Sequence, residues 1–121
     1  MNTFTWLVIG HLVGDWLLQN DWMAKGKKRD LFDPAGMVHY AVYTATVIGA
    51  LRLSGARDET LAFYALFCAI TFVSHWLIDA TNIIVRWMRF YRQSDLEMVR
   101  VMVDQTMHLL VLALLAVSVG R

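Results

Sequence analysis

The chain has 121 residues, and 58% of them are hydrophobic, against about 45–50% in typical soluble domains. A soluble domain of this length cannot bury so much apolar surface, because small domains bury only about two-thirds of the surface that the unfolded chain exposes. A net charge of +1 provides no general field for nucleic acid, and the single cysteine excludes an intramolecular disulfide. The sequence therefore predicts one integral membrane domain over residues 1–121.

Four apolar runs follow one another along the chain, and none alternates with the period of two that a strand requires. We expect helices over residues 4–23, 37–53, 60–87 and 95–119, with lengths typical of bilayer-spanning segments. The second run is the shortest and also fits a re-entrant segment or a buried core helix. Ser94 with Glu97 three residues later predicts a capping box at the start of the last helix. The predicted fold class is all-α, an integral membrane four-helix bundle.

Basic residues gather in two of the predicted connections. The segment Lys25–Arg29 carries four of them, and the connection before the last helix is bordered by Arg86, Arg89, Arg92 and Arg100. Basic connections stay on the cytoplasmic side of a membrane, so both termini are expected on the outer side. The simplest interpretation of Lys25–Arg29 is a topology signal that faces anionic headgroups, and a site for an acidic substrate is the alternative.

Each of the four runs carries one histidine. Three of them also carry an aspartate four residues away, on the same helix face, in the pairs His11/Asp15, His75/Asp79 and Asp104/His108. With a rise of about 1.5 Å per residue, these six side chains and His39 fall into one layer in the cytoplasmic half of the bilayer. An aspartate at the centre of a membrane helix costs about 2.5–3.5 kcal/mol on insertion, so we expect a compensating partner.

Imidazole and carboxylate groups together are ligands of zinc, iron and manganese, and zinc is the first expectation here. The predicted ligands are His11, Asp15, His39, His75, Asp79, Asp104 and His108. This set exceeds the ligands of one catalytic zinc, which indicates either a two-metal site or carboxylates that orient the histidines around a single ion. Further polar residues are expected to hold a water or a substrate near the metal: Gln19, Tyr43, Asn82 and Gln105.

These motifs resemble those of a known family. The segment Gly10–Ala24, the lysine-rich connection, His39, Ser74–Asp79 and Asp104–His108 are similar to the bacterial integral-membrane family catalogued as domain of unknown function 3307. The resemblance covers nearly the whole chain and implies a small protein of the bacterial inner membrane, without naming a substrate. Ser74–Asp79 is also more loosely similar to membrane-bound metal-dependent hydrolases, although the Pro-Asp-x-Asp-like element of that family has no counterpart here.

The first functional hypothesis is therefore metal-assisted hydrolysis of a lipid-soluble or membrane-anchored substrate, with membrane lipids as surroundings and no nucleic-acid partner. In it His11, His75 and His108 are ligands. Asp79 and either Asp15 or Asp104 complete the set, and the remaining aspartate is the general base. His39, expected nearest the surface, is a ligand or an acid.

Two alternatives belong to other classes. One is a transporter of metal ions or protons, which the sequence disfavours because the predicted helices contain no proline and only Gly14 and Gly49 as internal candidates for a break. Four helices also form a poor pore unless the chain forms a homo-oligomer. The other is a non-catalytic module whose polar layer fixes helix packing. His11/Asp15 and His75/Asp79 occupy equivalent places in two helical hairpins, so a weak internal repeat is a further hypothesis.

Overall fold

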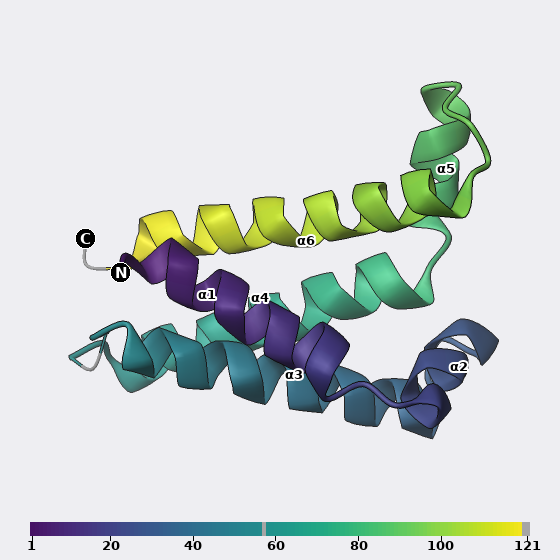
Figure 1. Cartoon of the computed structure of the whole chain (residues 1–121). Coiled ribbons are helices and arrows are strands. Elements are labelled where there is room, and N and C mark those ends of the chain that lie inside the picture. The colour runs from purple at the N-terminus through teal and green to yellow at the C-terminus, as the bar shows by residue number, and fades with distance from the viewer. Residues whose placement is uncertain (57, 120–121) are drawn as a thin grey trace.

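The computed structural model describes residues 1–56 and 58–119, and every regular element in this part of the chain is helical (Figure 1). The elements are α1 (Thr3–Leu12), the π-helical turn η1 (Val13–Leu17), α2 (Asp21–Arg29), α3 (Pro34–Leu53), α4 (Leu61–Ala80), α5 (Ile83–Phe90) and α6 (Glu97–Ser118). No strand occurs among the described residues, so the all-α fold class is confirmed.

Helices α1, α3, α4 and α6 run lengthwise through the molecule (Figure 1). Helix α3 packs against α1, α2 and α4, while α6 packs against α1, α4 and α5. The N-terminus, the α3–α4 turn and the end of α6 lie at one end of the molecule, and α2 and α5 lie at the other (Figure 1). The two short helices thus lie together at the end opposite the termini (Figure 1).

The first apolar run is not the continuous helix that we expected over residues 4–23. It passes into the π-helical turn, where the Leu18 N–H donates to the Val13 carbonyl at 2.9 Å, and it ends there. A new helix, α2, starts because Asn20 caps it by accepting a hydrogen bond from the Met23 N–H at 3.0 Å. The lysine-rich segment expected as a loop is therefore the end of α2.

The third apolar run is also divided. Helix α4 ends at Ala80, and Thr81 has extended backbone angles, with its hydroxyl donating to the Leu77 carbonyl. Helix α5 then runs in a new direction, across the end of α6 (Figure 1). It buries Ile84 and Met88, one turn apart, against α6. The predicted helix over residues 60–87 is thus two helices at an angle.

Two other helix starts differ from the prediction. Helix α3 begins at Pro34, before the expected start, because Asp33 caps it by accepting from the Ala35 N–H at 2.9 Å. With 20 residues it is as long as α4, so the expected short second helix is wrong. Helix α6 begins after Leu96 without a side-chain cap, and Ser94 instead accepts from the Leu96 N–H, so the predicted capping box is absent.

The apolar core lies toward the end that holds the termini. It consists of Leu7, Tyr43, Val47, Leu51, Phe67, Leu112 and Leu115, contributed by α1, α3, α4 and α6. Helices α4 and α6 are long and apolar enough to span a membrane, with mean hydropathy of 1.9 and 1.8. Only 22% and 17% of their most apolar 18-residue segments are buried. Much of their apolar surface therefore faces outward, which supports membrane association.

Candidate metal centre

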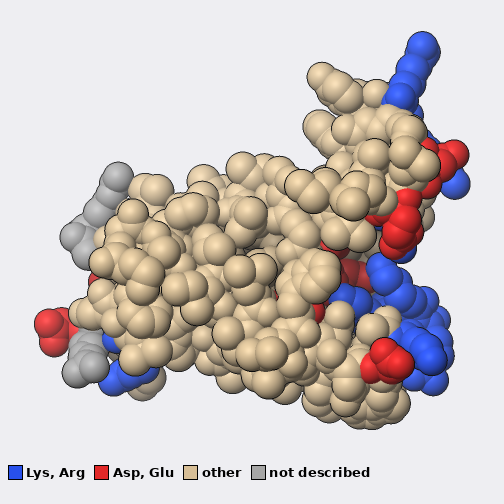
Figure 2. Space-filling model, in the orientation of Figure 1, with Lys and Arg blue, Asp and Glu red and all other residues tan. Residues whose placement is uncertain are grey.

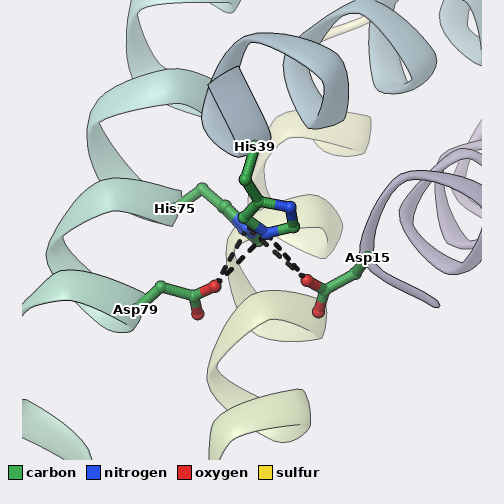
Figure 3. Close-up of side chains that lie close together, drawn as sticks. All are labelled: Asp15, His39, His75 and Asp79. Atoms are coloured by element: carbon green, nitrogen blue, oxygen red, sulfur yellow. Dashed lines mark hydrogen bonds and ion pairs between the residues drawn. The ribbon is translucent and has the colours of Figure 1, made fainter. Parts of the chain in front are cut away.

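Four polar side chains from three elements meet inside the bundle (Figure 3). Asp15 comes from η1, His39 from α3, and His75 and Asp79 from successive turns of α4. Each is at most 5% exposed. The close approach of η1 to α3 depends on Gly14, where a Cβ atom would lie 3.0 Å from the Tyr43 Cα atom. The absence of a side chain at Gly14 therefore lets η1 approach α3, and this places Asp15 beside His39.

The four ligand atoms lie at nearly equal separations. The two Nε2 atoms of His39 and His75 are 2.9 Å apart. Asp15 Oδ1 lies 3.2 Å from the first and 3.6 Å from the second, and Asp79 Oδ2 lies 3.5 Å and 3.2 Å from them. Ligand atoms held at about 2.0–2.1 Å from a tetrahedral zinc ion are about 3.3–3.4 Å apart. Five of the six separations in the group thus lie between 2.9 and 3.6 Å, around the edge length of such a tetrahedron.

These four groups keep unsatisfied polar atoms, although Asp79 Oδ2 accepts from the Lys27 ammonium at 2.8 Å and Asp15 Oδ2 accepts from Gln105 at 3.2 Å. Asp15 Oδ1 and the Nδ1 atoms of His39 and His75 are buried without a hydrogen-bond partner among the described residues. Each Nε2 atom faces another imidazole nitrogen and two carboxylate oxygens, so protons on the imidazoles or a metal ion must lie between these atoms. The arrangement could hold a metal ion.

A second group adjoins the first and contains Asp15, Asp104 and His108. His108 Nε2 lies 3.0 Å from Asp79 Oδ1 and 3.7 Å from Asp104 Oδ1. The side-chain amide of Gln105 donates to Asp15 Oδ2 at 3.2 Å and to Asp104 Oδ2 at 3.1 Å. Gln105 therefore holds the Asp15 carboxylate of η1 beside the Asp104 carboxylate of α6, although the like charges of the two groups repel.

His11 lies outside both groups. Its Nε2 atom is 2.7 Å from Gln105 Oε1, an oxygen that can only accept, so this nitrogen is the donor. The opposite nitrogen, Nδ1, then accepts from the Tyr43 hydroxyl at 3.0 Å. Both ring nitrogens are thus engaged with Gln105 and Tyr43, and neither is directed at the ligand groups, although the His11 ring lies 5.5 Å from the His108 ring between centroids.

Tyr43 touches two histidines. Its ring stacks on the His75 imidazole with centroids 3.7 Å apart and planes inclined by 13°, while its hydroxyl bonds to His11. The stacking fixes the plane of the His75 ring, so Tyr43 lies next to the centre as the sequence predicts.

Gln19 and Asn82 have different positions. Gln19 borders a cavity beside Asp15, and its Oε1 atom is buried without a hydrogen-bond partner among the described residues. Asn82 is exposed at the start of α5. His39, expected nearest the surface, is completely buried.

Lys27 is the residue that sequence reasoning missed. Its Nζ atom lies 2.8 Å from Asp79 Oδ2, and its side chain is 12% exposed. Burial lowers the pKa of Lys27, but the Asp79 and Asp15 carboxylates outweigh it and raise the pKa above the usual value, so this ammonium stays charged. Gly26 makes the contact possible because α2 packs against Ala35 there with no room for a larger side chain.

Two cavities lead to the cluster at the end that carries α2 and α5. One has a volume of about 240 Å³ and is bordered by Asp15, Trp16, Gln19 and Gln105. The other, of about 110 Å³, is bordered by Lys28, Arg100 and Ile84. Lys27 and Asp104 line both cavities. Figure 2 shows basic and acidic atoms gathered at this end of the molecule.

These features define a small all-helical protein with a buried His/Asp centre that could hold a metal ion. The chain belongs to the family described as protein of unknown function DUF3307, whose model matches residues 3–121. No curated protein and no solved structure matches the chain.

Proposed function

We propose that this chain is an integral membrane, metal-dependent hydrolase whose ion is bound by Asp15, His39, His75 and Asp79. The observation that carries the proposal is the near-tetrahedral convergence of one atom from each of these buried side chains, at separations of 2.9–3.6 Å. Zinc fits this ligand number and donor set first, with iron or manganese as alternatives. Four protein ligands fill a tetrahedral shell, so the ion would supply a water nucleophile near neutral pH by accepting that water as a fifth ligand.

The buried charges support a divalent cation. With neutral histidines, the carboxylates of Asp15, Asp79 and Asp104 carry three negative charges, and the Lys27 ammonium offsets one of them. The remaining two negative charges equal the charge of one divalent ion. Unpaired carboxylates would otherwise be costly inside the protein.

Asp104 is best placed to act as the general base. Its side chain is 24% exposed, whereas those of Asp15 and Asp79 are 5% and 2% exposed. It also lines both cavities, so it can receive a proton from a water beside the centre. Gln105 orients this carboxylate, and His11 in turn orients Gln105. His11 is thus a positioning residue in this proposal, and His39 is a ligand.

A membrane setting completes the proposal. Helices α4 and α6 would span the bilayer, and α3 with α1 and η1 would complete a four-helix bundle. The basic residues of α2 and α5 lie at the end nearest the cluster, so the positive-inside rule assigns that end to the cytoplasm. In a bacterial inner membrane, a lipid-soluble or membrane-anchored substrate would reach the cluster through the two cavities.

Metal content of the detergent-purified protein tests the proposal. We expect about one tightly bound equivalent of metal per chain in the wild type and none in the double variant His39→Ala/His75→Ala. Circular dichroism shows whether the variant keeps its helices. A folded wild type that takes up no added zinc, iron or manganese would contradict the proposal and leave a structural polar layer as the explanation.

Transport is a second candidate, and the divided helices favour it. The sequence argument against transport relied on unbroken helices, but η1 and the residues up to Asn20 interrupt the first run beside Asp15. Thr81 interrupts the third run, two residues after Asp79. Interrupted membrane helices commonly line the ion sites of transporters. Metal or proton flux into liposomes that disappears in His108→Ala, without substrate turnover, would favour transport over hydrolysis.

A further inference from the structure

We infer that the cluster is a two-ion centre, in which a second divalent cation binds His108, Asp104 and the outer oxygens of Asp79 and Asp15. The inference rests on the proposed first site, which it extends, and it makes Asp104 a metal ligand in place of the general base. In the proposed centre, one ion is enclosed by buried ligands and the other ion faces the cavities.

Asp79 faces two sets of ligands with different atoms. Its Oδ2 atom lies 3.2 Å from His75 Nε2 and 3.5 Å from His39 Nε2, within the first site. Its Oδ1 atom lies 3.0 Å from His108 Nε2, on the other side. A carboxylate whose two oxygens face separate histidines is arranged as a bridging ligand between two ions.

Asp15 repeats this arrangement. Its Oδ1 atom faces His39 at 3.2 Å, whereas its Oδ2 atom accepts from Gln105 next to Asp104. Asp15 is also the residue shared by the two groups that could hold a metal. The two candidate sites are therefore joined by two carboxylates.

Gln105 preorganises the second site without occupying it. Its amide donates to the Oδ2 atoms of Asp15 and Asp104, which leaves Asp104 Oδ1 directed toward His108. The separation of 3.7 Å between Asp104 Oδ1 and His108 Nε2 is too long for a hydrogen bond but suits two ligands of one ion. His11 and the Trp16 indole both donate to Gln105 Oε1, at 2.7 Å and 3.3 Å, and fix the orientation of the amide.

The two sites differ in access. The ligands of the first site are at most 5% exposed, but Asp104 borders both cavities, beside Lys28 and Arg100 in the smaller one. The second ion should therefore exchange readily, while the first should resist chelators. Two divalent ions exceed the two net negative charges of the cluster, so the second ion should bind together with an oxyanion, such as the oxyanion group of a substrate.

The test is a titration with Mn²⁺ of detergent-purified protein that has been freed of both ions by chelator at low pH and checked as metal-free, followed by elemental analysis and electron paramagnetic resonance. We compare the wild type with Asp104→Asn, which keeps the size of the side chain, and with His108→Gln. Asp95→Asn, an exposed aspartate in the connection before α6, is the matched control. Titrations with and without inorganic phosphate show whether an oxyanion assists the second ion.

The expected wild-type result is one tight and one exchangeable Mn²⁺ with a spin-coupled spectrum, because shared carboxylates place the ions close together. Asp104→Asn and His108→Gln should keep the tight ion and show the spectrum of an isolated ion, while Asp95→Asn behaves as wild type. A wild type that saturates at one ion, with or without phosphate, overturns the two-ion inference and leaves the first site intact. Retention of both coupled ions in Asp104→Asn and His108→Gln also overturns it. A wild type that binds no ion overturns the proposed function itself.

Discussion

The two halves of the bundle are built from the same helices, but one half is apolar and the other is polar. Toward the termini, α3, α4 and α6 contribute Val47, Phe67 and Leu112 to a closely packed apolar core. Toward α2 and α5, the same three helices contribute His39, His75 and His108 to the polar cluster. The apolar half contains the groups that stabilise the fold by burial, so the polar half is free to hold charges that destabilise it.

Replacing Asp79 should give the largest effect in the polar half. Asp79→Asn removes a ligand of both proposed sites and the partner of the Lys27 ammonium. We expect complete loss of bound metal and a loss of stability of about 3–5 kcal/mol, the usual result of removing one partner from a buried ion pair. The double variant Asp79→Asn/Lys27→Met should recover much of the stability but no metal. Elemental analysis and thermal unfolding in detergent measure both, and recovery of metal in the double variant would contradict this role of Asp79.

Phe67→Ala tests the apolar half. Phe67 is buried in the core, far along α4 from His75, and its truncation leaves a cavity. We expect a loss of about 3–5 kcal/mol in stability. The folded fraction should keep the metal content of the wild type. If metal is lost while the helices remain folded, the two halves are not independent.

Gln105→Leu should weaken metal binding without abolishing it. The variant removes the amide that holds Asp15 and Asp104 together while keeping a similar side-chain volume. Removing such an orienting group typically lowers metal affinity by about 10–100-fold, and the exchangeable ion should be affected most. Competition with a fluorescent chelator measures the change. An unchanged affinity would mean that the carboxylates keep their positions without the amide.

Lys27→Met should change affinity in the opposite direction. The ammonium of Lys27 competes with a metal ion for Asp79 Oδ2, and its removal leaves the cluster one unit more negative. We expect divalent cations to bind about tenfold more tightly, equivalent to about 1.4 kcal/mol. The exposed neighbour Lys25→Met is the matched control and should not alter affinity. Weaker binding in Lys27→Met would indicate that the lysine supports the site instead of competing with the ion.

Tyr43→Phe should have the smallest effect. The variant keeps the ring stacked on His75 and removes only the hydroxyl that donates to His11. The expected cost is about 1 kcal/mol in stability, typical of one hydrogen bond, with less than about tenfold loss of metal affinity. Tyr43→Ala, which also removes the stacking, should cost far more. Equal losses in the two variants would show that the hydroxyl bond to His11, and not the stacking on His75, accounts for the effect of Tyr43.

Helical periodicity was sufficient to predict the depth of the cluster. It brought Asp15, His75, Asp79 and His108 into one layer, because residues four apart share a helix face and rise is constant. It could not predict which side of each helix faces the others. Periodicity alone therefore favours His11 over His39 as a ligand, although packing places His11 against Tyr43 and Gln105.

The breaks in the first and third runs were harder to predict for a related reason. The polar residues at the breaks form short stretches, residues 19–21 and 81–82, and hydrophobic residues resume directly after each. Lys27 was assigned to the surface because a lysine in a basic segment usually faces solvent. Its inward position depends on the close fit of Gly26 against Ala35, a contact between elements that no local pattern contains.

The π-helical turn at Val13–Leu17 has a consequence for how this chain tolerates changes in length. The hydrogen bond from the Leu18 N–H to the Val13 carbonyl encloses one residue more than an α-helical turn does. Deleting one residue there would allow an ordinary α-helical turn, which spans nearly the same arc with one residue fewer. Asp15 lies inside this turn, so the change would move its carboxylate relative to His39. Substitutions in this turn can preserve the centre, but the number of residues in the turn cannot change without moving Asp15.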